Sequence, residues 1–352
     1  MTGCSILYVG SLAEGQTCLY RYHALERLGH RLIPFDMDRY VFKQKTLSAL
    51  RFRFPMGPLI AGVNAALLDA VKKEKPDVVW MDKPIDFTAA TIKRIRALGA
   101  QTVDYNQDNP FGPRNDGCWH QFYKSFRSFD LHCLLRNADI PRYKGWGLNY
   151  LKIQLSYDPV VHFPPPKEWS DQDQPRGASY IGHPHEDRAN FLRTLIEREK
   201  LPVVISGSGW LPVMVGEERA RYTSAGILQD AQGMLKGKDY REAIWKSKIN
   251  LSFVTLLNEE DVAHKAFEIT ACGGFLLAFR TPGHLACFEE GKEAEFFSTV
   301  EECAEKVRYY LAHPAERAEI ARRGCERAKR SGYDNDTQLG LVLSRLEEMR
   351  HT

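Results

Sequence analysis

The sequence lacks the features that define several common classes of protein. No uninterrupted apolar run reaches the ~18 residues that a membrane-spanning helix needs, so we expect no transmembrane segment. The start, Met1 to Ser5, has no basic region followed by an apolar stretch, so we expect no signal peptide. The eight cysteines form no Cys-x-x-Cys pair. They predict reduced thiols in a cytoplasmic protein rather than a disulfide or zinc framework.

An excess of charge of one sign is also absent. The chain has 48 basic and 45 acidic residues, which leaves a formal net charge of +3. This balance gives no reason to expect nucleic acid as the main partner. His183 and His185 lie two residues apart, but no further ligand follows at a suitable spacing, so we expect no metal site.

The sequence does contain enough apolar material for a soluble globular protein with two hydrophobic cores, since 43% of its 352 residues are hydrophobic. Residues 5–9 form an apolar run of strand type, a glycine loop follows, and residues 17–28 have a helical pattern. This unit predicts an α/β fold with a parallel sheet. Gly10 and Gly15 do not complete the G-x-G-x-x-G fingerprint of dinucleotide-binding proteins. The sequence therefore lacks the strongest evidence for a dehydrogenase.

A polar cluster follows the strand expected at residues 101–105. It runs from Asn106 to Gly112 and is interrupted by Pro110. Ligands of open α/β sheets bind beyond the carboxyl ends of the strands, so Asp108 is a candidate for a carboxylate that faces the substrate. The alternative is that Asp108 only caps the following turn, as Asp and Asn often do.

Residues 40–57 combine basic and aromatic side chains. This composition suits a surface that meets an anionic acceptor or a membrane. The plainer interpretation, which we prefer from the sequence alone, is a solvated helix with a few buried aromatic residues.

The pattern starts again after a stretch rich in proline and polar residues at 164–175, which predicts a linker. Residues 178–182 repeat the order of strand and glycine, and a helix is expected at 189–198. Two such openings predict two Rossmann-like domains. We place the first at 1–165 and the second at 176–332, and we expect the helix at 333–352 to cross back to the first.

Several residues of the second domain suit a ligand that carries phosphate. A strand ends at Gly207 and Gly209, where the backbone can approach a ligand closely. Trp210 follows and could line a nucleotide pocket, although a packed core tryptophan is the safer interpretation. Arg188 stands at the start of the expected helix, where its plain interpretation is a surface residue in the first helical turn.

The stretch from Glu259 to Phe279 organises the rest of the chain. Acidic residues open it, a helical pattern follows, and Gly273-Gly274 leads into an apolar strand. On a helix, the spacing of Glu260 and Glu268 would put both within about 80° of one face and ~12 Å apart along it. A helix start can also hold an anion. Together these features suit a nucleotide sugar, with its diphosphate at the helix start and a carboxylate on its vicinal hydroxyls.

The segment Phe267-Glu268-Ile269-Thr270-Ala271-Cys272-Gly273-Gly274-Phe275-Leu276-Leu277 resembles the signature of the CgeB-like (spore maturation protein CgeB) glycosyltransferases, bacterial relatives of the retaining group 1 glycosyltransferases. Asp108-Asn109-Pro110-Phe111 is similar to the D-x-P-F segment of that group, and Gly207-Ser208-Gly209-Trp210 to its G-x-G-W segment. The resemblance spans most of the chain and is strongest from 178 to 325. Near Asp108 the chain departs from other members of the superfamily, which place a histidine there.

This resemblance implies a GT-B fold, in which two Rossmann-like domains face a central cleft. The first domain would bind the acceptor and the second the nucleotide sugar. The implied activity is that of a hexosyltransferase that moves a sugar from a nucleotide-sugar donor, most commonly a UDP-sugar, to an unknown glycan, protein or small molecule. It would need no metal or other cofactor, and it would retain the anomeric configuration.

The resemblance also implies residue roles. Glu268 would hydrogen-bond the ribose diol, Glu260 would face the donor sugar, and Asp108 would be the base if the enzyme inverts. Arg188 stands where related enzymes place a lysine or arginine that holds the donor diphosphate, and a fixed cation there would neutralise the charge that develops on the departing group. The catalytic candidates are therefore Asp108, Glu260 and Arg188. The donor-binding candidates are Gly182, His183, Arg188, Gly207, Gly209, Trp210, His264, Lys265 and Glu268.

Two other functions remain open at this point. A GT-B epimerase or phosphorylase would share the fold, and an epimerase would convert a nucleotide sugar with no acceptor present. A non-catalytic nucleotide-sugar-binding or coat-assembly protein would bind such a compound without releasing nucleoside diphosphate.

Overall fold

The computed structural model describes residues 3–40, 44–114, 117–167, 169–229 and 233–351. The chain forms two compact units. Unit 1 comprises Met1–Gln154, Leu257–Glu259 and Asn335–Thr352, and unit 2 comprises Leu155–Leu256 and Glu260–Asp334. The first division therefore falls after Gln154, where the sequence suggested 165. The stretch that we expected to be a linker is part of unit 2, where the side chain of Gln174 donates to the carbonyl of Trp245 at 3.1 Å.

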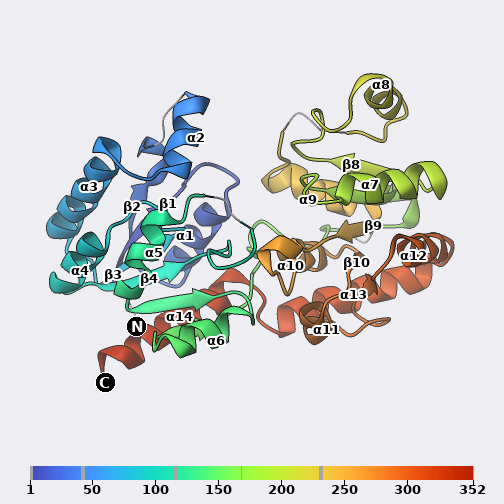
Figure 1. Cartoon of the computed structure of the whole chain (residues 1–352). Coiled ribbons are helices and arrows are strands. Elements are labelled where there is room, and N and C mark those ends of the chain that lie inside the picture. Colours follow the sequence, from blue (N-terminus) through green and yellow to red (C-terminus); the bar gives the residue numbers. More distant parts are fainter. Residues whose placement is uncertain (1–2, 41–43, 115–116, 168, 230–232, 352) are drawn as a thin grey trace. The chain divides into compact units, whose positions relative to one another are not determined.

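Unit 1 is built on a six-stranded sheet in the order β2-β1-β3-β4-β5-β6, and all of its strand pairs are parallel (Figure 1). The strands are β1 (Ser5–Gly10), β2 (Arg31–Asp36), β3 (Val78–Asp82), β4 (Gln101–Tyr105), β5 (Leu131–Leu134) and β6 (Tyr150–Lys152). The helices are α1 (Thr17–Arg27), α2 (Lys45–Arg53), α3 (Pro58–Glu74), α4 (Ala89–Ala97), α5 (His120–Ser125), α6 (Asp139–Gly145) and α14 (Asn335–Arg350), with 3-10 turns η1 (Met37–Tyr40) and η2 (Phe126–Ser128).

Helices cover both faces of this sheet. Strand β2 lies on one side of β1 and β3 lies on the other, so the chain reverses its direction across the sheet after β2. Because crossovers between parallel strands are right-handed, this reversal puts α1 and α3 on opposite faces of the sheet. α1 packs against α14, whereas α3 packs against α4. Strand β3 is consequently buried along its whole length. Such strands are nearly all apolar, which is why the sequence revealed them as short hydrophobic runs.

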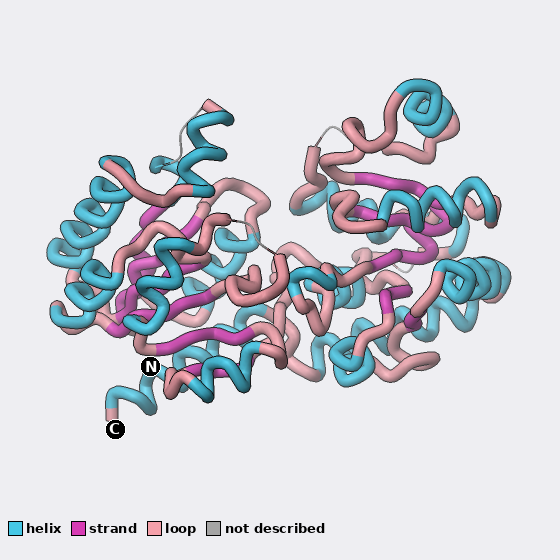
Figure 2. The backbone as a smooth tube through the Cα atoms, in the orientation of Figure 1, coloured by secondary structure: helices cyan, strands magenta, loops and turns pink. Residues whose placement is uncertain are grey.

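Unit 2 has a five-stranded sheet in the order β11-β10-β9-β7-β8, again with every pair parallel. Figure 2 shows strands of the chain in magenta and its helices in cyan. The strands are β7 (Arg176–Ile181), β8 (Val203–Ser206), β9 (Ser247–Ser252), β10 (Leu276–Phe279) and β11 (Glu295–Phe297). The helices are α7 (Arg188–Arg193), α8 (Gly216–Ser224), α9 (Gly237–Trp245), α10 (His264–Ala271), α11 (Pro282–Cys287), α12 (Val300–Ala312) and α13 (Pro314–Arg330); 3-10 turns η3 (Asp171–Asp173) and η5 (Leu256–Asn258) and a π-helical turn η4 (Thr194–Arg198) complete the set.

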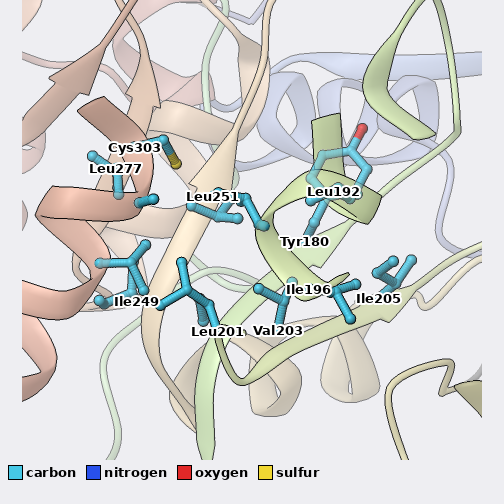
Figure 3. Close-up of a cluster of buried hydrophobic side chains, with 14 of the residues drawn as sticks. Tyr180, Leu192, Ile196, Leu201, Val203, Ile205, Ile249, Leu251, Leu277 and Cys303 are labelled. Atoms are coloured by element: carbon cyan, nitrogen blue, oxygen red, sulfur yellow. The ribbon is translucent and has the colours of Figure 1, made fainter. Parts of the chain in front are cut away.

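The core of unit 2 lies between its sheet and the helices that cover it. Figure 3 shows aliphatic side chains from the central strands meeting Leu192 of α7 and Ile196 of η4, with Cys303 of α12 nearby. This core fixes the carboxyl ends of β7 and β9, from which the residues considered below project. The prediction of an α/β fold with parallel sheets is confirmed.

Helix α14 belongs to unit 1, although it follows unit 2 in the sequence. Asp336 at its start pairs with Arg27 of α1 at 2.5 Å. Near its end the carbonyl oxygen of Leu346 accepts a hydrogen bond of 3.0 Å from the Gln101 side chain. These contacts, and the burial of one helix face, join the last residues of the chain to its first sheet.

Within the described part of the chain, no single helix combines the length and the apolar character needed to cross a membrane. Two segments, Thr46–Arg53 and Pro58–Glu74, satisfy the criterion only when they are counted together, and they are bent by 73° relative to each other.

Candidate functional site

Three glycines let two loops of unit 2 approach each other. Gly182 follows β7 and Gly207 follows β8, with φ of 113° at Gly207. A Cβ atom on Gly207 would lie 2.7 Å from the carbonyl oxygen of Gly182, and one on Gly209 would lie 3.1 Å from His183 Nδ1. The indole of Trp210 donates to the same Gly182 carbonyl at 2.7 Å. The loops therefore meet through backbone atoms, and only glycine fits there.

Trp210 itself is fully buried in the core of unit 2. The structure therefore gives it a supporting place, since its N–H holds the loop while its ring faces core residues. This matches the packed-core alternative rather than a tryptophan that lines the nucleotide pocket.

Arg188 starts α7 and is 8% exposed. Its guanidinium donates at 3.0 Å to Tyr180 Oη, to the Val254 carbonyl and to Thr255 Oγ1. Glu260 reaches the same place from the other side, because its carboxylate accepts from the Thr255 amide at 2.7 Å. Two of the catalytic candidates are thus fixed around Thr255, beyond the end of β9.

Lys265 extends from the first turn of α10 toward the Gly182 loop. Its Nζ atom would lie 2.5 Å from a Cβ on Gly182, and it lies 5.5 Å from the centre of the Tyr180 ring. Within the residues that the structure describes, neither Lys265 nor Arg188 forms an ion pair with a carboxylate. Two cations without a counterion, one of them buried, favour an anionic ligand, because burying an unpaired charge is costly.

His183 lies beside these cations. Burial, together with the charges of Lys265 and Arg188, lowers the pKa of His183 below its ordinary value. Its Nε2 atom is 3.0 Å from Ser208 Oγ. The imidazole is therefore neutral at pH 7, so it can offer a hydrogen bond to a phosphate without adding a third positive charge.

Glu268 lies within α10 and is 8% exposed. Tyr240 Oη donates to its carboxylate at 2.7 Å, and the Nε2 atoms of His162 and His264 lie 3.7 and 3.9 Å from Oε1. Burial alone would raise the pKa of Glu268, but the His264 and His162 imidazoles and the Tyr240 hydrogen bond outweigh it and lower this pKa. The result is an ionised carboxylate, ready to accept hydrogen bonds from a diol.

One expectation about this stretch is wrong. We expected Glu260 and Glu268 on one helix, but α10 begins only at His264, so Glu260 lies in the preceding loop. The chain there is held in a non-helical path: Glu259 has φ of 50° and belongs to unit 1, where it pairs with Arg142 at 2.9 Å. Glu259 therefore does not contribute to the helix N-terminus.

The start of α10 is fixed from a distant part of the sequence. His284 Nε2 accepts from the amide of Ala263, the residue before α10, at 3.1 Å. Its other nitrogen, Nδ1, is 2.7 Å from the carbonyl of Phe279. Burial lowers the pKa of His284 to about 4. This neutral imidazole thus uses one of the amide groups that we expected to be available to an anion.

Asp108 lies in unit 1, after β4. Its carboxylate pairs with Lys83 Nζ at 2.5 Å, and its amide donates to the Asn106 side chain at 3.2 Å. Burial works to raise the pKa of Asp108, but the Lys83 ammonium and its hydrogen bond lower it overall. A carboxylate held in its ionised form by a lysine is a weak base. The geometry therefore favours an electrostatic role for Asp108 over that of a general base.

Sequence reasoning missed the side chains that support these candidates. Tyr180 Oη and Thr255 Oγ1 accept hydrogen bonds from Arg188, and Tyr240 Oη donates to Glu268. Tyrosine and threonine are ordinary residues of a folded domain, and only their three-dimensional neighbours distinguish these three. In the described residues, no group of three or more His, Cys, Asp and Glu side chains is arranged as a metal site.

Comparisons with known proteins agree with this architecture. A family described as Glycosyl transferase-like matches residues 188–343. No curated protein matches the chain at the sequence level.

Solved structures match the chain over its whole length. A glycosyltransferase from Rickettsia africae is 13% identical, with a TM-score of 0.65 and 99% of each chain covered. Sucrose-phosphate synthase from Thermosynechococcus elongatus is 14% identical, with a TM-score of 0.64, over 98% of this chain and 100% of that one. Anabaena HepE in complex with UDP is 13% identical, with a TM-score of 0.61, over 98% and 100%. The chain therefore has the GT-B fold, and its residues 188–343 form a glycosyl transferase-like segment.

Proposed function

We propose that this protein is a glycosyltransferase of the group 1 type that transfers a sugar from a nucleotide-sugar donor to an acceptor. The observation that carries the proposal is the pair of cations in unit 2, Arg188 and Lys265, which have no carboxylate partner in the described residues and lie beside the glycine-lined loops. The glycosyl transferase-like match at residues 188–343 supports it. UDP, which is bound in the HepE structure, makes a UDP-sugar the first donor to test.

The proposed donor contacts follow from this geometry. Arg188, Lys265 and the neutral His183 bind the diphosphate, and Gly182 and Gly207 allow it to approach the backbone. Glu268, kept ionised by its neighbours, accepts from the two ribose hydroxyls. His264 borders this carboxylate on the same helix.

The proposed reaction needs little covalent chemistry from the protein. The bond between the anomeric carbon and the diphosphate oxygen breaks, and the acceptor oxygen forms a bond to the same carbon. With retention, the acceptor attacks on the face that the diphosphate leaves, and the leaving diphosphate oxygen takes the acceptor proton. Arg188 and Lys265 stabilise the charge that develops on the diphosphate, while Glu260 faces the positively charged sugar.

We propose further that the reaction requires no metal and takes place in the cytoplasm. In this scheme the two cations do for the diphosphate what a divalent ion does in other transferases. Addition of a chelator should therefore leave the transfer rate unchanged.

The test begins with a thermal-shift screen of nucleoside diphosphates and their sugars, because a ligand that binds the folded state raises its apparent stability. Release of nucleoside diphosphate is then followed across a panel of acceptors with the donor that binds. Lys265→Met and Arg188→Gln should each reduce the shift and the release. The proposal fails if no nucleotide sugar shifts the wild-type melting temperature, or if both variants respond as the wild type does.

The same assay separates the other candidates. An epimerase would convert the donor to a new nucleotide sugar with no acceptor present, and this would be seen by chromatography. A non-catalytic binding protein would show a thermal shift with the nucleotide sugars that it binds. It would release no nucleoside diphosphate with any acceptor.

A further inference from the structure

An apolar groove lies in unit 1, far in sequence from the residues discussed so far. Helix α2 contributes Leu47, Leu50, Arg51 and Phe54, which recur at the i, i+3, i+4 and i+7 spacing of one helix face. The beginning of α3 forms the other wall, and the two segments diverge by 73° (Figure 1). The groove encloses about 830 Å³. This volume falls within the range of sites that hold ligands.

The walls of the groove expose an unusual amount of apolar surface. Within ten residues, four of the lining side chains are exposed: Leu47 by 40%, Leu50 by 57%, Phe54 by 50% and Met56 by 68%. Single exposed apolar side chains are normal, but a contiguous group marks a surface that is covered by something else.

Helix α2 is nevertheless held in place. Arg51 forms an ion pair with Asp86, and both side chains are almost buried. The Asn64 side chain of α3 donates to the backbone carbonyl of Asp86 at 2.9 Å. Asp86 is therefore bound both by α2, through Arg51, and by α3, through Asn64. The apolar row is therefore presented by an anchored helix and not by a loose one.

Charge identifies the kind of partner. From residue 39 to residue 68 the sequence contains five basic residues and no acidic one, although Arg39 and Arg51 pair with Asp36 and Asp86 outside this range. Arg53 projects from α2, is exposed, and has no ion-pair partner among the residues that the structure describes. A surface that joins leucine and phenylalanine to unpaired arginine matches a bilayer of anionic lipids, whose acyl chains and phosphates present the complementary groups. Phe42 and Lys43, which we also noted in this segment, lie outside the described residues.

We infer that the groove between α2 and α3 docks unit 1 onto an anionic lipid surface. The apolar row enters the boundary between headgroups and acyl chains, and Arg53 contacts the phosphates. Helix α3 stays with the protein, because Val63, Leu67 and Val71 are committed to the core of unit 1. The inference is independent of sugar transfer, because binding to lipid needs neither donor nor acceptor.

Flotation of the full chain with vesicles tests this inference. The wild type should float with vesicles of equimolar phosphatidylglycerol and phosphatidylcholine, and binding should fall in high salt. Leu50→Gln should reduce the affinity for the vesicles roughly tenfold, because the leucine side chain would bury several CH₂ and CH₃ groups in the bilayer. Arg53→Gln should reduce it about fivefold on anionic vesicles.

Leu341→Gln is the matched control. Leu341 is also a helical leucine of unit 1, on α14, and is 48% exposed, so this variant should bind as the wild type does. Circular dichroism melting of each variant confirms that it is folded. Three results would overturn the inference: no wild-type flotation on anionic vesicles, equal loss in Leu341→Gln and Leu50→Gln, or saturable binding of monomeric lauric acid without vesicle binding.

Discussion

At the residue scale, the candidate site is defined by which charges are compensated and which are not. Asp108 is neutralised by Lys83, and Glu268 is held ionised by a tyrosine and two histidines. Arg188 and Lys265, in contrast, form no ion pair with a carboxylate among the described residues. A charged side chain without a partner does not stabilise the fold, whereas one in an ion pair can. The unpaired side chain is therefore the stronger indication of a ligand.

Glu268→Gln tests the proposed ribose contact. Loss of a charged acceptor should weaken binding of the donor by about 1.5–3 kcal/mol, because hydrogen bonds to charged groups contribute that much. Calorimetric titration with the nucleoside diphosphate measures the change. Glu316→Gln is the control: Glu316 is exposed on α13 and bound by the Tyr309 hydroxyl. Equal affinities in Glu268→Gln and the wild type would remove Glu268 from the site.

His284 predicts a dependence of stability on pH. Its pKa is about 4 in the folded chain, against 6.5 for an unperturbed histidine, so the unfolded state binds protons first as the pH falls. The free energy of unfolding should therefore decrease between about pH 6.5 and pH 4, by about 2 kcal/mol at pH 5, and be independent of His284 above this window. Urea unfolding of the wild type and of His284→Gln at pH 7 and pH 5 measures it. A difference between the two proteins that is the same at both pH values would contradict this.

At the element scale, the important feature is how loops are brought together at the ends of strands. The loops after β7 and β8 touch through the backbone, and α10 starts where His284 of α11 fixes the preceding amide. None of these contacts is local in sequence. Each depends on the strand order, which places β7 between β8 and β9.

Gly207→Ala tests the close approach of the two loops. Alanine at φ of 113° would be strained, and its Cβ would lie 2.7 Å from the Gly182 carbonyl. We expect a loss of stability of about 1–3 kcal/mol and a weaker thermal shift with nucleotides. Gly340→Ala in α14 is the matched control with the opposite sign, because its Cβ would meet nothing within 4 Å and alanine favours a helix by about 1 kcal/mol. Denaturant melts decide between these outcomes.

At the scale of the whole molecule, the two units do not follow the order of the chain. Unit 1 contains the first residues, the short piece Leu257–Glu259 and the last helix. Helix α14 buries Leu339, Val342, Leu343 and Leu346 in unit 1. The last residues of the chain are therefore part of the first domain, and the stability of unit 1 depends on them.

Removal of residues 335–352 should consequently unfold unit 1. Each of the four buried side chains contributes about 2 kcal/mol, and together they approach the roughly 5–15 kcal/mol that holds a domain folded. Limited proteolysis followed by mass spectrometry would show early cuts between residues 1 and 154. Leu341→Ala, at an exposed position of the same helix, should leave the cleavage pattern unchanged. A truncated chain that resists the protease as well as the full chain does would contradict this prediction.

The sequence by itself determined the class of the fold and named candidate residues for the site. Apolar runs of five or six residues separated by helical patterns favour parallel strands with helical crossovers, and glycine after a strand indicates a close approach of backbone. Gly207 was named on such grounds, whereas the roles of Arg188, Lys265 and Glu268 came from the resemblance to the glycosyltransferases.

Only the tertiary structure decided what each residue does there. The sequence could not show that Glu260 precedes the helix, because its path depends on Thr255 and on the departure of Glu259 into unit 1. Nor could it distinguish Trp210 in the core from a tryptophan in a pocket. Local preferences are short-ranged, whereas burial, charge compensation and hydrogen bonds between distant segments exist only once the sheet has brought those segments together.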